Sequence, residues 1–116
     1  MIAETPQTAA LLAELNAVLD EEIGLLSTRL EQMDRLSSAI VHRDDDAMEP
    51  LLEEMEQAQS RQQAADERLA GVRASLASVA DCPVSELRLS RLVKELRGPA
   101  RSDVARRRRR LVELSA

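Results

Sequence analysis

The sequence has 116 residues, no Phe, Tyr or Trp, and a formal charge of −5. This length allows a single domain over residues 1–116, and the lack of aromatic side chains argues against a wide core or an aromatic-lined ligand pocket. The one cysteine excludes an internal disulfide. No apolar run is long enough for membrane insertion, and the N-terminus lacks the pattern of a signal peptide, so we expect a cytoplasmic protein.

The first expected element is a helix over residues 6–41. Thr5 can cap its free amides, and Pro6 suits a first helical position because its missing N–H needs no partner there. Large aliphatic residues follow at steps of three and four, which is the spacing of one helix face. This stripe consists of Leu12, Leu15, Leu19, Ile23, Leu26, Leu30, Met33, Leu36 and Ile40.

A second helix is expected over residues 46–80, after an acidic break at which Asp46 is a candidate N-cap. Its own stripe repeats the same spacing, so the two helices are predicted to pack antiparallel with their stripes closed on each other. The residues from Ala58 to Ala65 are the smallest and most polar of that stripe, and we expect the weakest packing there. The stripe consists of Met48, Leu52, Met55, Ala58, Gln62, Ala65, Leu69, Val72, Leu76 and Val79.

Two shorter helices are expected at the C-terminal end, over residues 85–97 and 100–116. Pro83 ends the hairpin, and Gly98 followed by Pro99 separates the two short helices. The predicted fold is therefore all-α: a long antiparallel helical hairpin, a short third helix and a C-terminal fourth helix in an elongated bundle.

Charge is divided along the chain. Residues 1–67 hold 16 acidic and 4 basic side chains, whereas residues 68–116 hold 5 acidic and 12 basic ones. Five of these bases are consecutive, Arg106, Arg107, Arg108, Arg109 and Arg110, and we expect them to make electrostatic contacts with the acidic hairpin or with an acidic partner. Nucleic acid is a less favoured partner, because the chain is acidic overall and has no aromatic side chain for base stacking.

The sequence offers no catalytic constellation, and we expect neither an enzyme nor a cofactor or metal site. His42 is predicted to be a cation at a helix end, and Cys82 a small apolar residue at a helix junction. The acidic side chains Glu21, Glu22, Glu53, Glu54 and Glu56 are interpreted as solvated.

The order of these features resembles the FlgN family of flagellar export chaperones. The resemblance covers nearly the whole chain and rests on the acidic turn before residues 47–52, on residues 84–92, on Gly98 and Pro99, and on an arginine-rich last helix. It implies a cytosolic helical protein that binds C-terminal helical segments of hook–filament junction proteins, keeps them unassembled and brings them to the type III export apparatus. The family usually extends the last helix with asparagine and leucine repeats, which are absent here. The matching positions are Asp46, Leu51, Leu87, Leu92, Leu96, Val104, Arg110, Leu111 and Leu114.

A client helix is expected to lay its apolar stripe against the fourth helix and the adjoining hairpin. The same aliphatic residues can instead complete the intramolecular bundle. Two other functions stay open: a self-associating structural coiled coil that forms homo-oligomers, and an arginine-rich nucleic-acid accessory factor. The candidate client-binding residues are Leu92, Leu96, Val104, Leu111 and Leu114.

Overall fold

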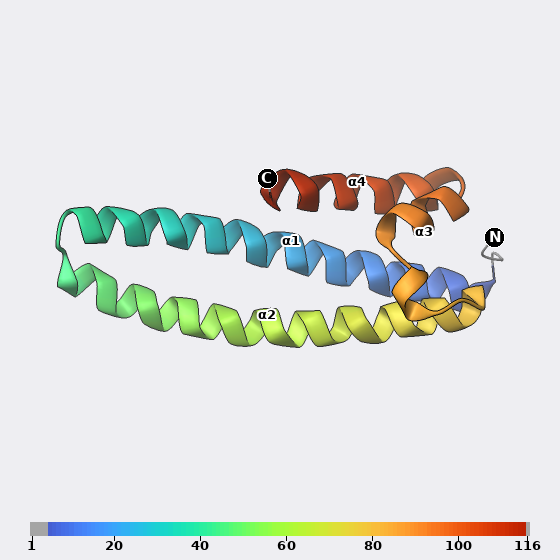
Figure 1. The fold of residues 1–116 in the computed structure, drawn as a ribbon, viewed down its shortest axis with the longest axis horizontal. Helices are drawn as coiled ribbons and strands as arrows, with labels where there is room; N and C mark the ends of the chain where they lie inside the picture. Colours follow the sequence, from blue (N-terminus) through green and yellow to red (C-terminus); the bar gives the residue numbers. More distant parts are fainter. Residues whose placement is uncertain (1–4, 116) are drawn as a thin grey trace.

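The structure is a computed structural model that describes residues 5–115. Its elements are helices α1 (Pro6–Val41) and α2 (Asp45–Ala80), the 3-10 turn η1 (Val84–Glu86), and helices α3 (Leu89–Glu95) and α4 (Gly98–Ser115). Helices α1 and α2 form a long antiparallel hairpin, and α4 lies along α1 only as far as its middle (Figure 1). The molecule measures 56 × 22 × 22 Å, so the predicted all-α elongated bundle is confirmed.

Short polar side chains cap both long helices. Thr5 Oγ1 accepts a hydrogen bond from the backbone N–H of Thr8 at 3.1 Å, and Asp44 Oδ1 accepts one from Ala47 N–H at 3.1 Å. The N-cap of α2 is thus Asp44, and the expectation that Asp46 holds this place was wrong. The turn between the helices is correspondingly short, and Arg43 within it has a φ of 50°.

The third helix is shorter than expected. Residues 85–97 were predicted to form one helix, but Leu87 has φ −88° and ψ 78° and separates η1 from α3. The side chain of Leu87 is buried in the core, and its carbonyl oxygen accepts a hydrogen bond from Arg73 Nη2 at 3.2 Å. The burial of Leu87 and the hydrogen bond that it accepts from Arg73 therefore outweigh the helical sequence pattern of residues 85–97. Gly98 turns the chain into α4 with a φ of 62°, a conformation that favours glycine.

The hydrophobic core lies where the hairpin, α3 and α4 meet. We call this the proximal half of the hairpin, residues 6–24 and 62–80, and we call residues 25–61 the distal half. Because only the proximal half is covered by a second layer, large side chains are buried there from every helix. The core consists of Leu12, Leu15, Val18, Leu19, Val72, Leu76, Ala77, Leu87, Leu92, Leu96 and Val104.

The predicted seam between the two long helices is wrong in the distal half. Leu30, Met33 and Ile40 are 42%, 48% and 57% exposed, although they continue the stripe that is buried in the proximal half. The distal residues of α1 buried instead are Gln32 and Ala39. Leu30 and Met33 follow Leu12 and Leu15 by 18 residues, or five full turns, so they lie on the same side of α1, which α4 covers only in the proximal half.

Two matched leucine truncations on α1 test this difference in burial. Leu19 is fully buried and Leu30 is 42% exposed. Leu19→Ala should lower the free energy of unfolding by about 2–5 kcal/mol, because it leaves a cavity in the core. Leu30→Ala should change it by less than about 1 kcal/mol. Urea denaturation followed by circular dichroism measures both, and equal losses would contradict the assigned core.

Candidate partner-binding surface

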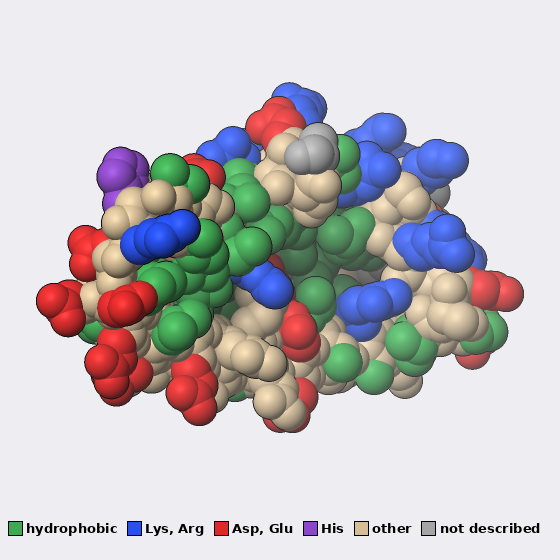
Figure 2. Space-filling model, turned by 60° about the vertical axis from the view of Figure 1, so that its left-hand side comes forward, with side chains coloured by type: hydrophobic (Ala, Val, Ile, Leu, Met, Phe, Trp, Pro, Cys, Tyr) green, Lys and Arg blue, Asp and Glu red, His purple; other side chains and the backbone are tan. Residues whose placement is uncertain are grey.

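An apolar surface remains uncovered on the distal half of the hairpin. We call it the distal apolar face. Figure 2 shows apolar side chains running from the turn, marked by the single histidine, towards a hollow that is flanked on its other side by basic side chains. Large contiguous apolar patches on a protein surface often mark a binding site. The face consists of the exposed Leu30, Met33, Ile40 and Leu52, with the half-buried Leu26, Met48 and Met55 beside them.

Acidic side chains surround this face. The distal half, residues 25–61, contains nine acidic and four basic residues. One of the four bases is already paired, since Arg35 Nη1 lies 3.0 Å from Glu54 Oε2. Asp44, Asp45 and Asp46 gather at the turn, where α2 begins. A partner surface that carries basic side chains next to apolar ones is therefore complementary to the distal apolar face.

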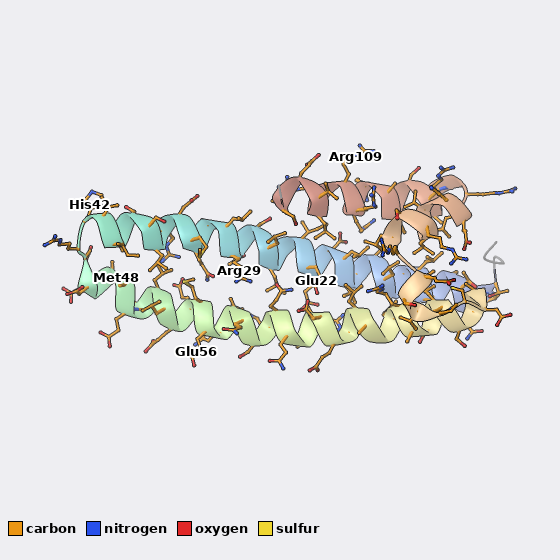
Figure 3. All side chains as sticks on the ribbon, in the orientation of Figure 1. Glu22, Arg29, His42, Met48, Glu56 and Arg109 are labelled. Atoms are coloured by element: carbon orange, nitrogen blue, oxygen red, sulfur yellow. The ribbon has the colours of Figure 1, made fainter. Side chains whose placement is uncertain are left out.

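The two long helices do not close completely beside the distal apolar face. A cleft of about 320 Å³ lies between them, and Figure 3 shows Arg29 on the side of α1 that faces it. The position of the cleft overlaps the stretch from Ala58 to Ala65, where the small and polar residues of α2 predict the weakest packing. The cleft is lined by Leu25, Arg29, Gln32, Leu52, Met55, Glu56, Ala58, Gln59 and Gln62.

A polar contact links the hairpin helices at the boundary between the two halves. Gln62 Nε2 donates a hydrogen bond to Glu22 Oε2 and another to Asp66 Oδ1, the latter at 2.9 Å. Burial, reinforced by the nearby Asp66 carboxylate, raises the pKa of Glu22 to about 7. The other carboxylate oxygen of Glu22 is buried and accepts no hydrogen bond within residues 5–115. The prediction that Glu22 is a solvated side chain was wrong.

Glu22 should make the stability of the protein depend on pH. Its pKa is about 7 in the folded protein against 4.5 for an unperturbed group, so the folded state binds more protons between these values. The free energy of unfolding should therefore fall as the pH rises from about 4.5 to about 7. Glu22→Gln should remove this loss, and urea midpoints at the two pH values measure it. The exposed Glu31→Gln is the control, and an identical loss in the Glu22 variant would contradict the assignment.

One arginine of the run fastens α4 to the hairpin. Arg107 makes a bidentate contact with Asp20 of α1, with Nε to Oδ1 at 2.8 Å and Nη2 to Oδ2 at 3.1 Å. Its side chain is only 15% exposed, and Nη1 also donates to the carbonyl oxygen of Asp103 at 2.9 Å. Paired guanidinium and carboxylate groups of this geometry fix orientation as well as adding energy. Arg107 thus makes the expected contact with the acidic hairpin.

The other four arginines of the run form no ion pair with the described residues of the hairpin. Arg106 lies 3.7 Å from Asp103 and Arg110 lies 3.5 Å from Glu113, and both partners are on α4 itself. Arg108 and Arg109 form no ion pair with any described residue. Figure 3 shows Arg109 projecting away from the hairpin. These side chains remain open to an acidic partner.

A second hollow, of about 350 Å³, opens between α2, α3 and α4. Its apolar lining comes from all three helices, and its three arginines belong to α2, to the N-cap of α3 and to α4. We call it the arginine groove. One of its arginines, Arg73, is held in place by its hydrogen bond to Leu87. The groove is lined by Leu69, Arg73, Arg88, Leu89, Ser90, Arg108, Leu111 and Val112.

The structure divides the five residues expected to bind a client. Leu92, Leu96 and Val104 are 2%, 5% and 0% exposed and belong to the core, where they hold α3 and α4 on the hairpin. Leu111 and Leu114 are half-buried, and Leu111 also lines the arginine groove. The first three side chains are therefore inaccessible to a client in this conformation, and the distal apolar face was missed.

The remaining candidates show no organised chemical site. His42 is exposed, and its Nδ1 donates to the carbonyl oxygen of Ser38 at 2.8 Å, while Cys82 is half-buried beside the core. Within residues 5–115, no cluster of three or more His, Cys, Asp or Glu side chains is arranged to hold a metal ion. The same residues contain no helix with the length and apolar character needed to cross a bilayer.

Comparisons with protein-family models, with curated proteins and with solved structures found no match to this chain.

Proposed function

We propose that this protein is a chaperone that holds an amphipathic helix of another protein against its distal apolar face. The observation that carries the proposal is the exposure of Leu30, Met33, Ile40 and Leu52 on a hairpin whose other half buries its apolar stripe in the core. Burying such a stripe against a second stripe is the usual basis of helix-in-groove recognition. The cleft between α1 and α2 offers further room for side chains of the bound helix.

The side chains of the distal apolar face can adapt to partner helices of different shape. Met33, Met48 and Met55 are unbranched and flexible, and surfaces rich in methionine repack around different apolar stripes. The acidic rim adds attraction for basic side chains on either side of that stripe. A chaperone needs this combination, because it holds a segment that later packs elsewhere.

Within this class, the flagellar export chaperones are the family that the sequence resembles. We propose that the partners are hook–filament junction proteins, held unassembled in the cytoplasm before they pass to the export apparatus. Two observations support the proposal: the order of the acidic turn, the short third helix and the arginine-rich last helix along the chain, and the all-helical architecture with half of its hairpin uncovered. Exposed arginines on α4, such as Arg109, supply contacts for an acidic export component.

Self-association into a structural coiled coil is the second candidate function. It is favoured by the acidic distal half and the basic α4, which would attract each other between copies. The two functions differ in oligomeric state, because a self-associating coiled coil forms larger oligomers as the protein concentration rises. Light scattering that shows a stable oligomer without affinity for a junction protein would support the structural coiled coil.

Charged substitutions on the distal apolar face test the chaperone function. Met33→Asp with Leu52→Asp should leave the helical circular dichroism unchanged, because both side chains are about half exposed, at 48% and 52%. Co-purification of a hook–filament junction protein should be lost, since two carboxylates would be desolvated in the contact and weaken it more than about tenfold.

A matched double variant controls for added negative charge. Thr28→Asp with Ala64→Asp changes one exposed position on each long helix, away from the apolar stripe. It should retain the junction protein. Undiminished co-purification with the Met33 and Leu52 variant would reject the distal apolar face as the site.

A further inference from the structure

The distal apolar face and the arginine groove lie along one side of α2. Residues 52, 55, 59, 62, 66, 69 and 73 recur at steps of three and four, and the first and last of them belong to the face and the groove. Leu52 and Leu69 are 17 residues apart in one helix, which corresponds to about 26 Å. A helix of about 18 residues spans that distance. One bound helix can therefore contact both.

The charges at the two ends of this path are opposite. Glu49 and Glu56 lie on the same side of α2 as Leu52 at one end, and Arg73, Arg88 and Arg108 line the groove at the other. A helix carries partial positive charge at its N-terminus and partial negative charge at its C-terminus. A bound helix is therefore favoured with its N-terminus beside Leu52 and its C-terminus at the groove.

The groove has guanidinium groups free to receive an anion. Arg73 is committed to the carbonyl oxygen of Leu87, but Arg88 and Arg108 are exposed and form no ion pair with another described residue. The apolar side chains of Leu69, Leu89 and Leu111 lie next to them. A chain end that combines one apolar side chain with a carboxylate matches this lining, because arginine binds carboxylates through two parallel hydrogen bonds.

We propose that the arginine groove receives the carboxyl-terminal end of the partner helix, with its terminal carboxylate bound by Arg88 and Arg108. This inference rests on the proposed function, because the rest of the helix lies on the distal apolar face. The partner is then an amphipathic helix of about 18 residues. It carries basic side chains beside its apolar stripe and ends in a free carboxyl group. The carboxylate contact also fixes the direction in which the helix binds.

Two synthetic peptides test the carboxylate contact. Both are 18-residue amphipathic helices with a leucine stripe and lysines in their first two turns, and they differ only in ending with a free carboxylate or an amide. Fluorescence anisotropy against the full chain should show that the free carboxylate binds about tenfold more tightly. Arg88→Gln with Arg108→Gln should weaken binding of the free-acid peptide to the level of the amidated one.

Arg106→Gln with Arg109→Gln is the matched control, because it removes the same charge from exposed positions of α4 outside the groove. It should preserve the tenfold difference between the peptides. Equal binding of both peptides to the unmodified protein would overturn the carboxylate contact and leave helix binding intact. Failure of both peptides to bind would overturn the proposed function as well. A dimer that dissociates when Arg88 and Arg108 are replaced would show that a second copy occupies the groove.

Discussion

The packing of α4 on the proximal half determines which surfaces of the hairpin are buried among the described residues. The hairpin helices have 36 residues each and extend about 54 Å, whereas α4 has 18 residues and extends about 27 Å. One apolar stripe of α1 is therefore buried from Leu12 to Leu19 and exposed at Leu30, Met33 and Ile40. Because the proximal half supplies the core, the distal half can expose apolar surface without loss of the fold.

Electrostatics and packing act together to place α4 on the proximal half. Val104 is fully buried among leucines of α1 and α3, and Arg107 holds Asp20 with two hydrogen bonds. Arg106 and Arg110 of the run pair with acidic residues of α4 itself, and no basic helix within residues 5–115 packs against the acidic distal half. The division of charge along the chain thus attaches α4 to the hairpin through Arg107 and Asp20, and it leaves the distal half acidic.

The sequence predicted the helical class and hairpin arrangement because heptad-like spacing and turn residues are local signals. It did not predict that Leu87 interrupts the third helix, since this depends on burial and on a bond from Arg73 that comes 14 positions earlier. The exposure of the candidate binding residues could not be predicted for a related reason. Periodicity shows that Leu92, Val104 and Leu30 lie on apolar faces, but only the arrangement of the helices shows that the first two are covered and the third is not.

The central claim is that the distal half of the hairpin is the uncovered half and is where a partner helix binds. Both parts of this claim can be tested by amide hydrogen exchange. The exchange is measured on the full chain alone and on the full chain with a hook–filament junction protein. The account predicts that residues 25–61 exchange faster than residues 6–24 and 62–80 in the free protein, and that the partner slows exchange chiefly in residues 25–61. Uniform exchange along the free hairpin, or protection confined to α4 on binding, would contradict it.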